Sequence, residues 1–499
     1  QGYDQSTLDL VSVFKDIGAN TGILSGLLYT YAAGDAPRRR RGGPWVVHMA
    51  GAAQGFAGYF MMWAAVSGLI PRPPVAVMCL FMIVAAHGQT FFNTADVVTA
   101  VRNFTGYSGT AVGIMKGFLG LSGAIIIQAY ETMFEGQPTA FLLMLSLLTS
   151  INPLLLMWFV RVYNDDAADE KKYLDNFSLI SVTVAVYLMV VIILQKVLNF
   201  QLVTRIITLV LLIGLLIVAP LVVVIRARAE RCDESDMLGR DGSAEYHPLP
   251  VDNEDDADTP EVEEWNLNLI QAMQTLDFWI LFFAMACGMG SGLATINNIS
   301  QVGGSLGYTT LETNTVVSLL SIWNFFGRFG AGYTTDYFLR SRRWPRPLFM
   351  AITLAGMSIG HIVIASGLSG ALYIGSLLVG IFYGSQWSLM PTIASEIFGV
   401  RHMGTIFNTI TIANPVGSYI FSVRIIGYIY DKEASAGDDT CTGTRCFFLS
   451  FMIMAAATFM GSLAALVLFF RTRSFYNSVI LARLLRPARE SKIKVAALH

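Results

Sequence analysis

Residues 202–226 read LVTRIITLVLLIGLLIVAPLVVVIR, and only two of these residues are charged. A helix that spans a bilayer needs about 20 mostly apolar residues, so this stretch predicts a membrane-spanning helix. The whole chain has the same character, with 54% hydrophobic and 14% charged residues. Ordinary soluble domains carry about a quarter charged residues. The composition therefore predicts an all-α polytopic membrane protein and excludes an ordinary soluble domain.

Twelve further apolar stretches flank this one, which gives about 13 predicted membrane-spanning helices. Those before it are 9–33, 44–69, 75–101, 109–131, 137–161 and 177–197. Those after it are 271–296, 313–336, 347–366, 369–393, 403–428 and 448–470. Between the two sets lies a polar stretch, 227–270, rich in Asp and Glu between positions 252 and 264. Such a stretch cannot build a core, so we expect a flexible linker.

Lys and Arg collect in loops on one side of the predicted membrane. They occur at 38–41, at 340–346 and in the tail after 470, whereas the loops of opposite parity are short or acidic. By the positive-inside rule the basic side is cytosolic. Counting the predicted spans back from these cytosolic loops places the start of the chain outside, which suggests that a first helix preceding residue 1 is missing. Restoring that helix would give 14 spans.

The predicted organisation has five parts. They are an amino-terminal helical bundle (1–162), an extra helix pair (163–226), an acidic cytosolic linker (227–270), a carboxy-terminal six-helix bundle (271–471) and a basic cytosolic tail (472–499). The extra pair contains few polar residues, so we expect it to pack peripherally.

Several motifs resemble those of known transporters. Gly332–Arg343, GYTTDYFLRSRR, resembles the cytosolic signature of the major facilitator superfamily, and Asp35 with the basic run at 38–41 forms a degenerate first copy. The following strings are similar to those of the plant nodulin-like, or "nuclear fusion defective"-like, transporters: FNTAD at 92–96, GIMKGFLGLSG at 113–123, GIFYGSQWSLMP at 380–391, FN at 407–408, ANPVGS at 413–418 and GYIYD at 427–431. The resemblance implies a major facilitator fold with a binding site at the midplane between two bundles. It also implies distant kinship to oxalate/formate and monocarboxylate carriers.

Arg328 is the first candidate for substrate binding. Asn324 lies four residues earlier, so both side chains are on one helix face. Monocarboxylate carriers resemble this arrangement, with an acid in place of Asn324, and a guanidinium suits a carboxylate. The alternative is that Arg328 snorkels or pairs beside Asp336 near the cytosol. Because Asn324 cannot titrate, proton coupling through an acid at that position is excluded.

Asp96 and Lys116 are predicted at matching depths on consecutive spans, which suggests an ion pair acting as a cytosolic gate or a structural lock. Other polar residues within spans are candidates for lining a cavity. They are Gln89, Asn93, Gln386, Asn408 and Asn414. Interhelical hydrogen bonding is the alternative for these residues.

Cys441 and Cys446 share one short polar loop and either form a local disulfide or remain free thiols. No metal site, cofactor motif or enzyme motif occurs, so we expect no enzyme, no cofactor and no nucleic-acid partner. The sequence predicts a transporter of a small solute, such as a monocarboxylate, that works by alternating access. The alternative is a non-transporting membrane sensor or scaffold. The plasma membrane is the first expectation for location, and an endomembrane, such as the vacuole or endoplasmic reticulum, is the second.

Overall fold

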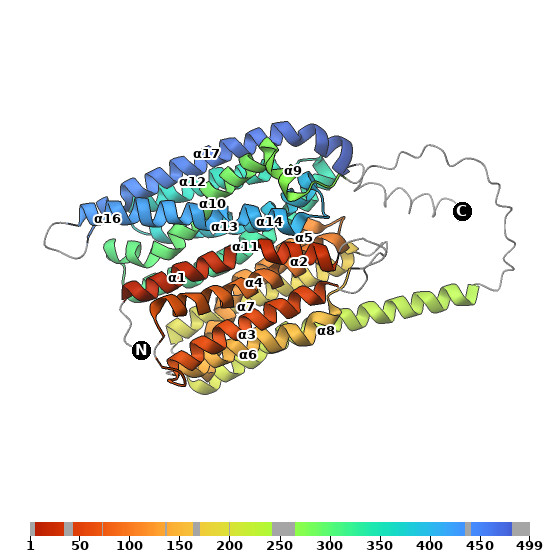
Figure 1. The fold of residues 1–499 in the computed structure, drawn as a ribbon, viewed down its shortest axis with the longest axis horizontal. Coiled ribbons are helices and arrows are strands. Elements are labelled where there is room, and N and C mark those ends of the chain that lie inside the picture. The colour runs from red at the N-terminus through yellow and green to blue at the C-terminus, as the bar shows by residue number, and fades with distance from the viewer. Residues whose placement is uncertain are drawn as a thin grey trace.

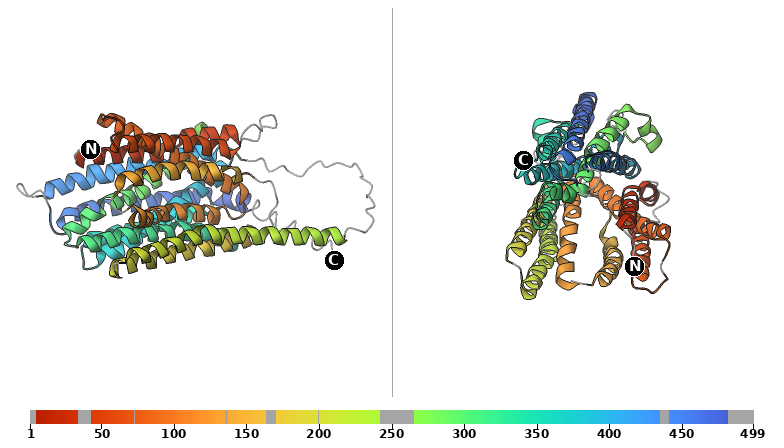
Figure 2. Two further views of the ribbon diagram at one scale, coloured as in Figure 1. Left: turned by 90° about the horizontal axis from the view of Figure 1, so that it is seen from below. Right: turned by 90° about the vertical axis from the view of Figure 1, so that its left-hand side faces the viewer.

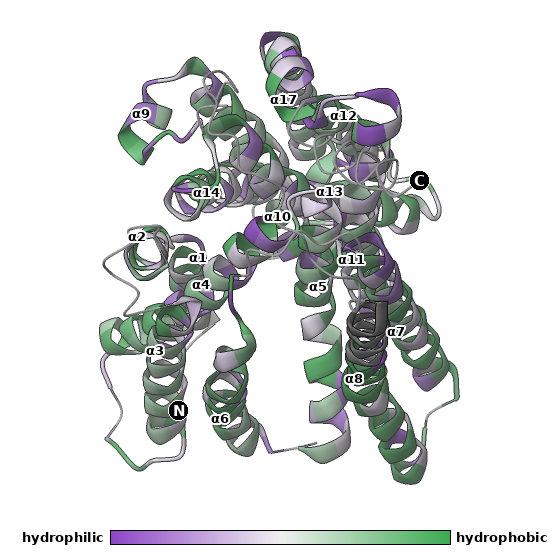
Figure 3. Cartoon of the chain, turned by 90° about the vertical axis from the view of Figure 1, so that its right-hand side faces the viewer, coloured by the Kyte–Doolittle hydropathy of each residue, from purple (hydrophilic) through white to green (hydrophobic). Residues whose placement is uncertain are grey.

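The computed structural model describes residues 5–33, 43–71, 73–134, 137–162, 170–198, 200–241, 265–434 and 441–481. These residues form helices and turns, without a strand among them. Two helical bundles lie side by side along their length (Figure 1; Figure 2 shows them from two further sides). The prediction of an all-α polytopic fold is confirmed. Hydrophobic colouring covers most of the helices seen end-on in Figure 3, as expected for helices surrounded by lipid.

The amino-terminal bundle contains α1 to α6. Its helices are α1 (Gln5–Asn20), α2 (Ile23–Ala32), α3 (Pro44–Val66), α4 (Val75–Asn103), α5 (Ser108–Met133) and α6 (Pro138–Leu156), which runs into the short helix η1 (Met157–Phe159). The first predicted span is broken between α1 and α2. Gly22 lies at this break, where a Cβ atom would collide with Asn408 of the other bundle.

The carboxy-terminal bundle contains α9 to α17. Its helices are α9 (Leu269–Met273), α10 (Leu276–Ser305), α11 (Thr310–Arg342), α12 (Arg346–Ser366), α13 (Ala371–Phe398), α14 (Met403–Thr411), α15 (Ala413–Ser418), the π-helix η2 (Tyr419–Gly427), α16 (Tyr428–Glu433), α17 (Arg445–Phe475) and the π-helix η3 (Tyr476–Ile480). The predicted span at 403–428 is therefore segmented. Pro415 lacks the N–H that would continue a regular helix there.

The extra helix pair consists of α7 (Glu170–Leu198) and α8 (Leu202–Asp241). Both helices pack against α5 through a hydrophobic cluster that includes Leu121, Leu188 and Leu212, and Phe325 of α11 joins the same cluster. The pair therefore lies beside the junction of the two bundles. α8 continues past the expected end at residue 226 and projects beyond the other helices (Figures 1 and 2). The Ala, Arg and Glu residues after position 226 favour helix. Residues 242–264 of the expected linker and residues 482–499 of the expected tail lie outside the described residues. The described part of the expected linker includes the start of α9, and residues 472–480 of the expected tail continue α17 and η3.

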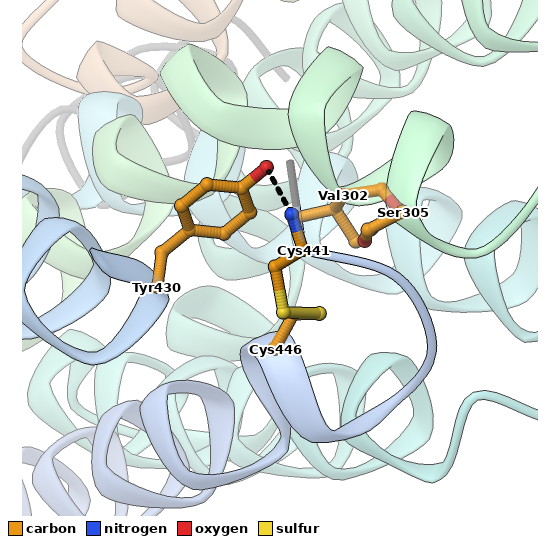
Figure 4. Close-up of a disulfide and its surroundings, with 5 residues drawn as sticks. All are labelled: Val302, Ser305, Tyr430, Cys441 and Cys446. Atoms are coloured by element: carbon orange, nitrogen blue, oxygen red, sulfur yellow. Dashed lines mark hydrogen bonds between the residues drawn. A yellow bond between two sulfur atoms is a disulfide. The ribbon is translucent and has the colours of Figure 1, made fainter. Parts of the chain in front are cut away.

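Eight of the described helices are long and apolar enough to cross a membrane by length and composition alone. Arginines gather at one end of the bundles, which we term the basic end. They are Arg102, Arg340, Arg342, Arg346 and Arg401. A disulfide joins Cys441 to Cys446 at the opposite end, where Tyr430 and the end of α10 anchor its loop (Figure 4). Since disulfides form on oxidising sides of membranes, this position agrees with a cytosolic basic end.

The two bundles approach closely along two seams. In one seam, α5 packs on α11, and a Cβ atom at Gly332 would collide with the Gly109 carbonyl. In the other, α2 packs on α14, and Gly26 meets the backbone of Gly404. Small residues allow helices to approach this closely in lipid. These contacts lie toward the basic end, so the structure represents a state closed at that end.

Candidate substrate site between the bundles

Two buried cations from different bundles face one indole ring. Lys116 on α5 is 1% exposed and Arg328 on α11 is 7% exposed. The Lys116 Nζ atom lies 5.2 Å from the centroid of the Trp387 ring, and the Arg328 Cζ atom lies 5.3 Å from it. Phe407 covers Lys116 from α14 at 4.9 Å. Four helices, α5, α11, α13 and α14, therefore converge on this site. Aromatic faces attract cations, and this attraction strengthens where water is excluded.

Neutral groups hold both cations in place. Lys116 Nζ donates a hydrogen bond to Asn93 Oδ1 at 2.6 Å. Arg328 donates from Nε to the Asn324 side-chain oxygen and from Nη1 to the Lys116 carbonyl, the latter at 3.1 Å. The prediction that Asn324 and Arg328 share a helix face is confirmed. The alternative to substrate binding, in which Arg328 snorkels or pairs beside Asp336, differs from this state, because Arg328 is buried and Asp336 pairs with Arg346.

The site lacks a compensating negative charge. Within the part of the chain that the structure describes, neither Lys116 nor Arg328 has a carboxylate within ion-pair distance. The buried Nε1–H of Trp387 also has no acceptor among those residues. An uncompensated buried charge is costly, by several kcal/mol per ion. The arrangement of two cations and an indole N–H is chemically suited to accept an anion.

Asp96 does not form the predicted ion pair with Lys116. Its Oδ1 atom lies 2.9 Å from His48 Nε2 on α3, whereas Lys116 bonds to Asn93, three residues before Asp96 on α4. The two residues do lie at similar depths. Asn93, rather than Asp96, is the residue of α4 that contacts Lys116 in this state.

The other predicted polar residues fall into two groups. Asn408 and Asn414 bridge the bundles: Asn408 Nδ2 donates to Thr94 at 2.8 Å, and Asn414 Nδ2 donates to Asn20 at 3.2 Å. Their role in this state is interhelical hydrogen bonding, the alternative considered above. Gln89 and Gln386 form hydrogen bonds within their own bundles. Gln89 donates to Tyr59 within the amino-terminal bundle, and Gln386 is buried against Met357 within the carboxy-terminal bundle.

Asp336 closes the basic end. Its carboxylate accepts hydrogen bonds from the backbone N–H of Gly109 and of Thr110 at the start of α5, at 3.2 and 2.5 Å. It also accepts one from Arg346 Nη2 at 2.6 Å, and Arg346 in turn bonds to Glu396. A helix amino terminus favours negative charge, so this contact joins the two bundles electrostatically.

Further contacts support the same closure. Arg340 donates to the Gly106 carbonyl at 3.0 Å and lies 3.7 Å from the centroid of the Tyr107 ring, both in the loop before α5. His402, in the loop before α14, has a lowered pKa because it is partly buried and lies near Arg401 and Arg102. The sequence did not predict Arg346, Glu396 or His48 as members of these clusters. Their only signal was an ionisable side chain in or beside an apolar span.

Comparison with known proteins agrees with this geometry. The chain matches the Nodulin-like family over residues 1–225 and the "NFD4, C-terminal domain" family over residues 261–478. It is 25% identical to Protein Nuclear Fusion Defective 4 of Arabidopsis thaliana over 95% of its own length and 84% of that protein. It is also 25% identical to the Probable transporter MCH1 of Yarrowia lipolytica, over 31% of this chain and 34% of that relative.

Solved structures show the same architecture. The proton:xylose symporter XylE of the major facilitator superfamily superposes with a TM-score of 0.51 at 12% identity, covering 93% of this chain and 86% of that one. The chain is thus a multi-pass membrane protein with the fold of the major facilitator superfamily. Within that fold class, the chain carries a Nodulin-like domain in its amino-terminal half and an NFD4 C-terminal domain in its carboxy-terminal half.

Proposed function

We propose that this protein is a secondary transporter of a small organic anion, such as a monocarboxylate. The observation that carries the proposal is the pair of buried cations, Lys116 and Arg328, which face Trp387 without a carboxylate at ion-pair distance in the described chain. A bound carboxylate would supply the missing negative charge, and charge-assisted hydrogen bonds to it are the strong ones. Because the two cations come from different bundles, movement of one bundle relative to the other would change the contacts of an anion bound to both.

Transport in this proposal proceeds by alternating access. The contacts of Asp336 and Arg340 with the start of α5 hold the basic end closed, and they must break for that end to open. The basic end is the cytosolic face in this proposal, and the disulfide end faces outward. The plasma membrane is the proposed location. Asn408 and Asn414 then act as seam residues whose bonds to the other bundle exchange during the cycle.

Exchange of labelled carboxylates in proteoliposomes tests the proposal. The panel consists of formate, acetate, lactate and pyruvate, measured with the wild type, Arg328→Gln and Arg424→Gln. Arg424 is an exposed arginine in η2 and serves as the matched control for loss of one positive charge. We expect saturable exchange of at least one acid by the wild type and by Arg424→Gln, and its loss in a folded Arg328→Gln. Equal exchange by Arg328→Gln and the wild type would contradict the proposed anion contact.

A further inference from the structure

His48 and Asp96 form a second polar cluster one helical turn from the Lys116 contact. His48 is buried on α3, and the Asp96 side chain on α4 is 41% exposed. His48 Nε2 lies 2.9 Å from Asp96 Oδ1, and His48 Nδ1 lies 3.1 Å from the Pro44 carbonyl. Both imidazole nitrogens are therefore within hydrogen-bond distance of an oxygen atom.

This geometry requires a proton beyond those of a neutral histidine and a carboxylate. The Pro44 carbonyl can only accept, so Nδ1 must carry a hydrogen. In a neutral ring Nε2 would then carry a lone pair instead of a hydrogen. This acceptor nitrogen would face an oxygen of an ionised Asp96, which is also an acceptor. A hydrogen bond at 2.9 Å between these two atoms needs one more proton, on the imidazole or on the carboxyl group. The pair in this state is thus proton-loaded and has no net charge.

Removal of that proton would change the environment of Lys116. Asn93, which holds the Lys116 ammonium, lies three residues before Asp96 and hence on the same face of α4. A deprotonated pair carries one negative charge, and its neutral imidazole can donate to only one of its two partners, Asp96 or the Pro44 carbonyl. The Asp96 carboxylate then competes with a substrate anion for Lys116.

The elements that pack on α3 and α4 carry the other titratable groups near the pair. The segments α6, η1 and α14 contain no Asp, Glu, His, Lys or Arg. Among the described side chains, the titratable groups on the remaining neighbouring helices are Lys15 and Asp16 on α1, Tyr29 and Tyr31 on α2, Tyr59 on α3, Cys79, His87 and Arg102 on α4, Lys116, Tyr130 and Glu131 on α5, and Tyr373, Tyr383 and Glu396 on α13. Lys116 is the cation one turn away.

We propose that His48 and Asp96 form a proton-binding site that couples proton movement to transport of the anion held by Lys116 and Arg328. This inference rests on the proposed function and adds its coupling ion. One proton enters the pair from the medium, and one monoanion binds the two cations. Both cross the membrane together. The proton then leaves from the pair, and the Asp96 carboxylate displaces the anion from Lys116. The cycle transfers one proton and one negative charge in the same direction, and it is electroneutral.

Two assays on phosphatidylcholine vesicles containing the full-length protein separate coupling from transport. The first measures exchange of labelled lactate at equal pH on both sides, which needs no net proton movement. The second measures accumulation of labelled lactate against an inward proton gradient of one pH unit. For one proton per anion, this gradient supports about tenfold accumulation, since one pH unit corresponds to 1.36 kcal/mol.

We expect the wild type to exchange lactate and to accumulate it about tenfold. His48→Gln, which keeps a hydrogen-bond donor but binds no proton, should still exchange and should not accumulate. Asp96→Asn provides a second variant with the same expectation. His87→Gln is the matched control, because His87 joins the same two helices through Gln54 at 2.6 Å and has no acidic partner among the residues that the structure describes. It should behave as the wild type in both assays.

Two outcomes would overturn the inference and leave the proposed function standing. One is tenfold accumulation by both His48→Gln and Asp96→Asn, and the other is wild-type exchange without any accumulation. Absence of exchange by the wild type with every acid in the panel would instead refute the proposed function, and the inference with it.

Discussion

Replacing Lys116 with Met tests whether the buried Lys116 ammonium group binds a ligand or stabilises the fold. Met matches the unbranched shape of Lys but removes the charge. Both cationic groups lie about 5 Å from one ring centroid, so their separation is at most roughly 10 Å. At an effective dielectric constant of about 20, two like charges at that distance repel by at least about 1.6 kcal/mol. The substitution also removes the cost of burying an ammonium group.

The variant should therefore bind the anion more weakly and should fold at least as stably. A hydrogen bond to a charged group contributes about 1.5–3 kcal/mol, which corresponds to a roughly 10- to 150-fold weaker affinity. The assays are the KM of carboxylate exchange and the thermal unfolding of the ligand-free protein in detergent. An unchanged KM together with a loss of several kcal/mol in stability would refute the reasoning, because Lys116 would then be a structural residue.

Three further predictions concern other parts of the chain. Asp336→Asn leaves Arg346 with less compensating charge and should cost about 3–5 kcal/mol of stability, measured by thermal unfolding. It should also expose the start of α5, so that a cysteine introduced by Thr110→Cys reacts with a water-soluble cysteine reagent. Cys446→Ser should destabilise the protein by about 2 kcal/mol, the value for closing so short a loop, and a reductant should reproduce this effect on the wild type but not on the variant. His402 has a lowered folded-state pKa, so the unfolded state binds more protons and stability falls as pH drops below about 6.5. His402→Gln should reduce that fall in unfolding scans from pH 8 to pH 5, and equal slopes for variant and wild type would contradict this reading.

The helices themselves could be predicted from the sequence, and their breaks could not. Each predicted span coincides with a helix or a segmented helix, because bilayer length and apolar composition determine this level of structure. At the break, Gly22 leaves room for the side chain of Asn408 from the other bundle. No local pattern in either segment encodes that approach. The helical extension of α8 to Asp241 was missed because its polar composition resembled a linker.

Pairing across helices was the part that the sequence could not determine. Arg328 and Asn324 were assigned to one face because they are four residues apart on one helix, and the structure confirms this. Asp96 and Lys116 are on different helices, and their depths alone did not specify which side chains meet. Helices that are apolar on most sides give little signal of their rotation. For the same reason, the contacts of Trp387 with the two cations became visible only in three dimensions.

The most direct test of the central claim compares a carboxylate with its uncharged amide. Proteoliposomes loaded with unlabelled lactate would be supplied with labelled lactate or labelled lactamide, using the wild type and Arg328→Gln. The account predicts saturable exchange of lactate by the wild type, no exchange of lactamide, and loss of lactate exchange in the variant. Equal handling of lactate and lactamide, or lactate exchange unaffected by Arg328→Gln, would contradict an anion site formed by Lys116 and Arg328.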